Sequence, residues 1–247
     1  MVAQIPTETT TQVIYPDCDG QPMSDNTKQF RWIVTIKENL ELLFAEDPQA
    51  FIAGDLLWYP VEGDHKIRQA PDAMVVFGRP KGDRGSYRQW VEDDIPPQVV
   101  FDVSTPLNTR ILSPGNRMTE MNRKLHFYDS RSETLCERYG VSEYYIYDPD
   151  RLDLAGWVRY EGRLESIEDT HNWISPRLGI RFSMQEDTLV IYRPEDRPFL
   201  SFVEIDQLRQ QAQQETQQAR QETQQARQQA EKLAAKLREL GIDPNDL

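Results

Sequence analysis

The chain has 247 residues, which is enough for one well-packed domain with an appendage and too few for two large domains. Its 41 Asp and Glu residues outnumber its 28 Lys and Arg residues, and the net charge is -13. This acidity argues against a protein that coats nucleic acid by bulk electrostatics, because that mode needs many cationic contacts to phosphates. It leaves room for an enzyme that touches DNA at one local groove.

Cysteine and histidine usage also limits the classes of protein. Cys18 and Cys136 are too few for a disulfide framework or a cysteine zinc cage, so we expect a reducing cytoplasm. His65, His126 and His171 share no ligand spacing, which disfavours a zinc hydrolase. The N-terminus lacks the basic start and apolar core of a signal peptide, and no apolar run approaches the length of about 18 residues that crosses a bilayer.

The first part of the chain predicts a lead-in, a helix and a strand. Residues 1–26 are polar and rich in Thr, Pro and Asp, so we expect an extended segment. A helix is expected to start near Asp25, which can cap it. Its apolar face comprises Phe30, Ile33, Val34, Ile36, Leu40 and Leu43. Residues 51–59 are then typical of one strand, ended by Pro60.

The middle of the chain predicts a sheet. The runs "AMVVF" and "QVVFDV" are short and apolar throughout, as in strands buried on both faces. The spacing of Met118, Met121, Leu125 and Tyr128 predicts a helix that opens at Asn116. The next strand, "VSEYYIYDP", has tyrosines that suit a half-exposed position, and short strands follow over residues 152–192. The order helix, three strands, helix, strand predicts a mixed α/β domain with helices against a central sheet.

The C-terminal part, residues 203–241, predicts one long helix. Its sequence repeats "ETQQARQ" and places apolar or small residues at alternating steps of four and three: Ala219, Thr223, Ala226, Ala230, Leu233, Leu237 and Leu240. Because this seam is rich in Ala and Thr, we expect a weak coiled coil, with a homo-oligomer or a partner helix joined through residues 205–240. The alternative is a solvated single helix that serves as a linker or solubility tail.

Two acids at strand ends are candidate metal ligands. Asp72 begins one buried strand and Asp102 lies near the end of another, so their carboxylates converge on one hard cation if the strands are neighbours, and the Val103 carbonyl can add a third ligand. Lys124 on the following helix can offset charge on a phosphate. The alternatives are that Asp72 only forms a turn and that Lys124 makes a solvated ion pair with Glu120. Asp102, inside "VVFDV", is costly unless it is paired, ligated or at the strand end.

Four strings carry a resemblance to a known family. They are "AGDLLWYPVEGDHKIRQAPDAMVVFG", "GSYRQWVEDDIPPQVVF", "LSPGNRMTEM" and "ERYGVSEYYIYDPD". Together they closely resemble the Uma-type restriction endonucleases, which are abundant in cyanobacteria and assigned to the PD-(D/E)XK nuclease superfamily. The resemblance implies a restriction-endonuclease-like domain over residues 27–200 and Mg²⁺- or Mn²⁺-dependent cleavage of DNA. Asp72 and Asp102 match the family's metal-binding acids, and Lys124 matches its catalytic lysine.

The chain also departs from that family. Asp102 stands where the family normally has a glutamate, and Ser104 occupies the older lysine position. Two inserts, "STPLNTRI" and "DSRSETLC", lie on either side of the helix that carries Lys124 and can displace it. These departures support a second hypothesis, a catalytically degenerate nuclease-fold protein that acts in binding or assembly through its C-terminal coiled coil. The candidate DNA contacts are Arg110, Arg117 and Arg123.

Overall fold

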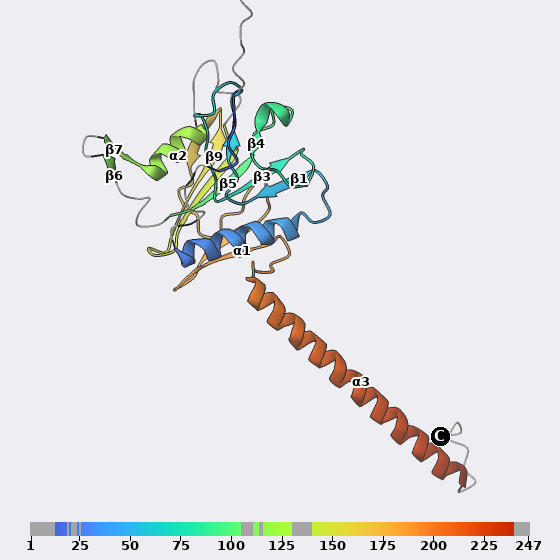
Figure 1. The fold of residues 1–247 in the computed structure, drawn as a ribbon. Helices are drawn as coiled ribbons and strands as arrows, with labels where there is room; N and C mark the ends of the chain where they lie inside the picture. Colours follow the sequence, from blue (N-terminus) through green and yellow to red (C-terminus); the bar gives the residue numbers. More distant parts are fainter. Residues whose placement is uncertain are drawn as a thin grey trace, which may run out of the picture. The chain divides into compact units, whose positions relative to one another are not determined.

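The structure is a computed structural model of the chain (Figure 1). It describes residues 13–18, 20, 24, 26–104, 111–113, 116–129 and 140–239, with the backbone alone at residues 111–113, 116–123, 129 and 237–239. The chain divides into two compact units, residues 1–199 and 200–247. Within the described ranges, each helix is too short or too polar to cross a bilayer.

Helix α1, Thr27–Leu43, opens the first unit. Its N-cap is Asn26, whose side-chain oxygen accepts hydrogen bonds from the backbone N–H groups of Lys28 and Gln29, both at 3.0 Å. The prediction that Asp25 caps this helix is therefore wrong by one residue. The helix packs on strands β1, β3 and β5 (Figure 1). Its buried stripe comprises Gln29, Ile33, Ile36, Asn39 and Leu40.

The described residues form a six-stranded central sheet in the order β1-β3-β5-β8-β9-β10. Neighbouring strands are antiparallel except β5 and β8, which are parallel. A parallel pair requires a crossover connection, and helix α2, Glu120–Asp129, lies in that connection. The strands are β1 Ala50–Ala53, β3 Ala73–Phe77, β5 Val99–Val103, β8 Glu143–Asp148, β9 Asp153–Tyr160 and β10 Arg163–Ser166.

Short pairs of strands flank the sheet. They are β2 Trp58–Tyr59 with β4 Tyr87–Arg88, β6 Ile111–Ser113 with β7 Asn116–Thr119, and β11 Arg181–Met184 with β12 Leu189–Tyr192, and a short 3-10 helix η1 spans Gln89–Val91. Two predicted boundaries are corrected. The strand expected over residues 51–59 is broken at Asp55, which has a left-handed φ of 48°, into β1 and β2. The helix expected from Asn116 begins at Glu120 instead, because residues 116–119 pair with β6.

Both faces of the sheet are buried, which explains the continuous apolar runs. Along β5, Val99, Phe101 and Val103 belong to the core under α1, whereas Val100 belongs to a second core on the other face. The tyrosines of β8 were expected to be half-exposed, and this is wrong: Tyr144, Tyr145 and Tyr147 are buried. The reason is the central place of β8, which lies between β5 and β9. Asp102, in β5 next to Val103, is buried in the same sheet.

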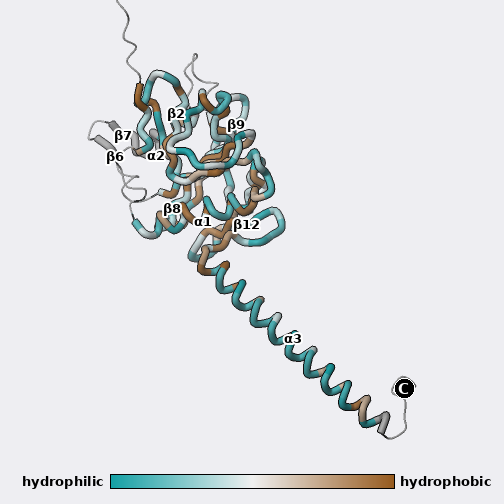
Figure 2. Tube along the Cα trace, turned by 45° about the vertical axis from the view of Figure 1, so that its right-hand side comes forward, coloured by the Kyte–Doolittle hydropathy of each residue, from teal (hydrophilic) through white to brown (hydrophobic). Residues whose placement is uncertain are grey.

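The predicted architecture is confirmed: the first unit is a mixed α/β domain whose core runs α1, β1, β3, β5, α2, β8, with a mixed sheet flanked by helices. The second unit contains helix α3, Phe202–Glu239, of 38 residues. Figure 2 shows that α3 is hydrophilic along most of its length and becomes more hydrophobic toward its C-terminal end.

The cap at Asn26 holds the start of the helix that carries Gln29. Replacing Asn26 by Ala removes the acceptor of two backbone N–H groups and is expected to destabilise the domain by about 1 kcal/mol. Asn26→Asp keeps an acceptor oxygen and is the matched control, with little expected loss. Urea unfolding of both variants measures the difference, and equal stability of Asn26→Ala and wild type would contradict the role of this cap.

Candidate functional site

The register of two neighbouring strands brings Asp72 and Asp102 together. Ala73 pairs with Phe101 in the antiparallel ladder of β3 and β5, so the preceding Asp72 lies opposite Asp102. The Val103 N–H donates to Asp72 Oδ2 at 2.6 Å, and the Asp72 N–H lies 3.4 Å from Asp102 Oδ1. The two predicted acids therefore converge from adjacent strands at one end of their ladder, and Asp72 does more than form a turn.

Lys124 reaches this acid pair from α2. Its Nζ donates to Asp102 Oδ1 at 2.6 Å, and only 6% of the residue is exposed. The alternative of a solvated lysine is therefore wrong. The two inserts, whose residues 105–110 and 130–136 lie outside the described part, leave Lys124 within hydrogen-bond distance of Asp102. All three predicted site residues thus form one cluster.

Two further residues hold the carboxylates and were not singled out from the sequence. The Tyr144 hydroxyl of β8 donates to Asp102 Oδ2 at 2.8 Å. The Gln29 side-chain amide of α1 donates to the Val103 carbonyl at 3.1 Å and lies 3.5 Å from Asp72 Oδ2. A signal for Gln29 was present in the sequence, because this polar residue continues the helix stripe of Ile33, Ile36 and Leu40. Tyr144 had no such signal, since its neighbours in the strand are also tyrosines.

Aromatic rings form one wall of the cluster. Tyr128 of α2 lies parallel to Trp58, with ring centroids 6.3 Å apart, and edge-on to Tyr144 at 4.7 Å. Its buried hydroxyl has no hydrogen-bond partner among the residues that the structure describes. Burial, and next the charge of Asp102, raises the pKa of both tyrosines well above the usual range. Both hydroxyls therefore keep their protons, and that of Tyr144 donates to Asp102 as a neutral group.

The cluster has an excess of negative charge. Burial raises the pKa of Asp72 to about 7; Lys124 opposes this shift, and Asp102 adds to it. One lysine cannot neutralise two ionised carboxylates, and little solvent is available because only 6% of Asp72 and 1% of Asp102 is exposed. A second positive charge at Asp72 would relieve this imbalance.

The oxygens of the cluster are chemically suited to a small divalent cation. Asp72 Oδ1 accepts no hydrogen bond from any residue in the described ranges, so it has free lone pairs. Mg²⁺ is commonly held by one or two carboxylates, with waters and phosphate oxygens completing its octahedron. Among the described residues, no group of three or more His, Cys, Asp and Glu side chains gathers as in an all-protein cage. The donor set therefore fits Mg²⁺ or Mn²⁺ with two protein carboxylates.

Other predicted residues contribute less. Ser104, at the older lysine position, is 3% exposed, and its N–H donates to the Tyr147 carbonyl at 2.7 Å as part of the sheet. Arg110 lies outside the described residues, as do the side chains of Arg117 and Arg123. Their expected contacts with DNA remain predictions.

Comparisons with known proteins find little similarity to this chain. No family model matches the chain, and no curated protein matches it. Four chains of solved structures match. One, from Anabaena variabilis ATCC 29413, is described as "a putative nuclease belonging to DUF820"; it has 14% sequence identity and a TM-score of 0.37, over 61% of this chain and 72% of that one. At that level of similarity the likeness adds nothing to the geometry.

The raised pKa of Asp72 predicts a pH dependence of stability. The folded protein binds this proton more tightly than the unfolded chain does, where the pKa is near 3.8, so the stabilising contribution is present below that value and is lost as the pH rises through about 7. Asp72→Asn cannot ionise, so its melting temperature relative to wild type should increase between about pH 5 and about pH 8 in metal-free buffer. A difference that stays constant over this range would contradict the raised pKa.

The ion pair of Lys124 with Asp102 predicts strong coupling between the two side chains. Lys124→Met leaves the buried carboxylates without a cation and should cost about 3–5 kcal/mol of unfolding free energy. Adding Asp102→Asn removes the uncompensated charge and should recover most of that loss. Urea unfolding of the two single variants and the double variant measures the coupling. Additive effects would mean that the two side chains do not depend on each other.

Proposed function

We propose that this protein is a metal-dependent nuclease that hydrolyses phosphodiester bonds of DNA. The observation that carries the proposal is the meeting of Asp72, Asp102 and Lys124 at the end of the β3–β5 ladder. Three ionisable side chains, each less than 10% exposed, are costly in a domain core, and a buried group with a shifted pKa beside charged partners, as Asp72 is here, is typical of functional sites.

Each residue has a role in this proposal. Asp72 and Asp102 hold Mg²⁺ or Mn²⁺, which when bound supplies a Lewis acid and lowers the pKa of the attacking water. The Val103 N–H and Gln29 fix the orientation of Asp72, and the Tyr144 hydroxyl fixes Asp102. Lys124, already beside Asp102, offsets the negative charge that develops on the phosphate oxygens.

The substrate assignment rests on the sequence resemblance and on the chemistry of the cluster. Two carboxylates with one lysine suit a phosphodiester, because the cation neutralises the phosphate and the lysine supplements it. With a net charge of -13, the protein needs a local cationic surface to approach DNA. Arg110, Arg117 and Arg123, in the stretch around the start of α2, are the proposed contacts.

Cleavage of supercoiled plasmid with Mg²⁺ or Mn²⁺ tests the proposal. Asp72→Ala and Asp102→Ala should each lower the rate by at least about 100-fold, because each removes a proposed ligand. Glu143→Gln is the matched control: Glu143 is also buried, but it accepts hydrogen bonds from Ser175, Tyr145 and the Arg177 N–H, away from the acid pair. It should lower stability and leave the cleavage rate per folded molecule unchanged.

The cation itself gives a second readout. Calorimetric titration of Mg²⁺ in the presence of a short non-cleaved duplex, after subtraction of the heat of Mg²⁺ binding to the duplex alone, should show binding heat with wild type and none with the variant Asp72→Ala, Asp102→Ala. Plasmid cleavage by Asp72→Ala at the wild-type rate would rule out the proposed site, whatever the titration shows.

One observation favours a second function, a catalytically degenerate nuclease-fold protein that acts in binding or assembly through α3. Both oxygens of Asp102 already accept hydrogen bonds, from Lys124 and from Tyr144, as in a closed structural network. In that case wild type neither binds Mg²⁺ nor cleaves DNA. The variant that combines Asp72→Asn, Asp102→Asn and Lys124→Met then folds with undiminished stability, because only a buried charge network has been neutralised.

A further inference from the structure

Helix α3 carries a seven-residue repeat that also orders its charges. The string "ETQQARQ" occurs at Glu215 and again at Glu222. In heptad terms the inner a positions are Thr216, Thr223, Ala230 and Leu237, and the inner d positions are Ala219, Ala226, Leu233 and Leu240. In the two repeats the flanking g positions are Glu215 and Glu222, and the flanking e positions are Arg220 and Arg227, so there one side of the seam is acidic and the other basic; the later g positions are Gln229 and Lys236.

The two Glu–Arg pairs of the repeats do not meet within their own helix. Glu215 and Arg220 are five residues apart, as are Glu222 and Arg227, which places each pair about 140° apart around the helix axis. In the described part of α3, none of the four forms an ion pair; Glu215 only accepts a hydrogen bond from Gln211, at 3.0 Å. All four side chains are exposed. The spacing of five residues matches contacts between helices, because a g residue faces the e residue of the next heptad across a parallel coiled coil.

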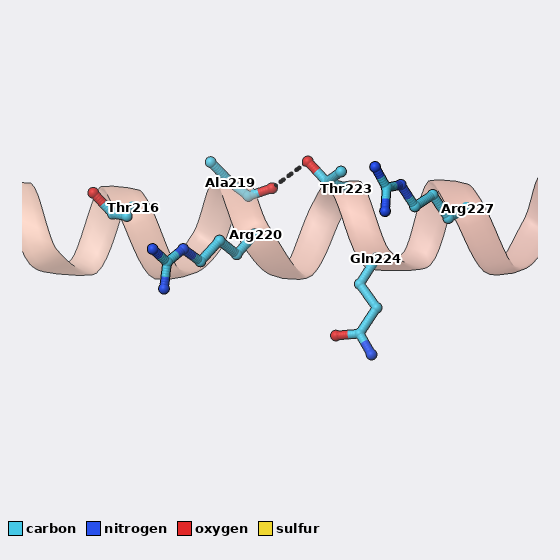
Figure 3. A pocket seen from close by; sticks show the side chains of 6 residues that line it. All are labelled: Thr216, Ala219, Arg220, Thr223, Gln224 and Arg227. Atoms are coloured by element: carbon cyan, nitrogen blue, oxygen red, sulfur yellow. Dashed lines mark hydrogen bonds between the residues drawn. The ribbon is translucent and has the colours of Figure 1, made fainter.

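The threonines of the seam present methyl groups. The Thr216 hydroxyl donates to the Ala212 carbonyl at 2.8 Å, and the Thr223 hydroxyl donates to the Ala219 carbonyl at 2.7 Å (Figure 3). With these hydroxyls bonded to the helix backbone, the exposed part of each threonine is apolar. β-Branched residues at a positions favour two strands in a parallel coiled coil.

A shallow hollow lies on this face of the helix. It is lined by Thr216, Ala219, Arg220, Thr223, Gln224 and Arg227, and the first four are successive a, d, e and a positions (Figure 3). A knob from a facing helix enters a hole made by four such residues. The hollow is thus of the kind that receives a d residue, such as Ala219 of a second copy.

We propose that α3 pairs with a second copy of this chain as a parallel, in-register, two-stranded coiled coil over residues 212–239. Glu215 and Glu222 form ion pairs with Arg220 of the partner subunit and Arg227 of the partner subunit, and the same pairs recur by symmetry. An antiparallel dimer would place g against g and e against e, which brings Glu beside Glu and Arg beside Arg. The helix is therefore self-complementary in one direction only.

The seam also sets the strength of the dimer. The repeat itself supplies only Ala and Thr to the seam, and the leucines come after it in the sequence, beginning with Leu233, which is 62% exposed. Upstream, Arg209 occupies an a position and pairs with Asp206 of its own helix at 2.8 Å, so the contact begins at Ala212. Because the apolar area is small, the ion pairs decide the direction and the association weakens with salt.

A cysteine placed in the seam of the full-length chain tests the register, with Cys18 and Cys136 replaced by Ser. Ala219→Cys should form a disulfide-linked dimer under mild oxidation, because equivalent d positions of a parallel dimer lie within the Cα separation of about 6 Å that a disulfide needs. Gln221→Cys, at an outward f position, is the matched control and should form no disulfide between the two copies. Equal cross-linking of the two variants, or none in either, would overturn the proposal.

Charge exchange tests the pairing itself. Glu215→Arg with Glu222→Arg puts like charges at every g-to-e contact and should weaken the dimer at least about tenfold at low salt. Adding Arg220→Glu and Arg227→Glu restores opposite charges and should restore the dimer. Sedimentation equilibrium measures the mass, and circular dichroism verifies that the helix content is kept. A monomeric wild type would rule out pairing with a second copy and would leave the helix to a different partner. If the four substitutions together do not restore the dimer, these ion pairs are excluded.

Discussion

The buried charge of Asp102 is the constraint on which the first unit depends. A carboxylate inside a central strand is tolerated only when donors surround it, and Lys124 and Tyr144 supply them. Both donors follow from the topology: β8 lies parallel to β5, and the crossover that this requires contains α2. The crossover between β5 and β8 therefore also places Lys124 beside Asp102. Helix α1 completes the enclosure from the other side through Gln29.

The carboxylate of Asp72 accepts fewer close hydrogen bonds than that of Asp102. This difference distinguishes the cluster from a simple buried ion pair. One of its oxygens accepts from the Val103 N–H, while the other accepts no hydrogen bond within the described part of the chain. Its pKa near 7 reflects burial beside a second acid that one lysine cannot neutralise. An acid of this kind suits the proposed metal-assisted hydrolysis, whereas Asp102, both of whose oxygens accept hydrogen bonds, also fits a purely structural network.

The second unit is stabilised by different interactions from the first. In the first unit, order comes from two apolar cores on either face of a sheet. In α3, the described side chains up to residue 236 are nearly all exposed, so helix propensity and local hydrogen bonds such as Thr223 to Ala219 maintain it. The distinguishing feature of α3 is the order of its charges. That order is visible in the sequence because a heptad repeat involves only residues that are close together in the chain.

The sequence by itself determined the elements whose pattern is local: the apolar runs of β3 and β5, the fold class, the position of Asp72 and Asp102 at strand ends, and the long helix. Only the tertiary structure decided which groups meet. Gln29 reaches Asp72 across 43 residues and Tyr144 reaches Asp102 across 42, and no periodicity encodes such separations. The break at Asp55, the helix start at Glu120 and the burial of the β8 tyrosines were also decided there. Strand pairing and the covering of both faces of the sheet override local propensity, because burial is set by distant parts of the chain.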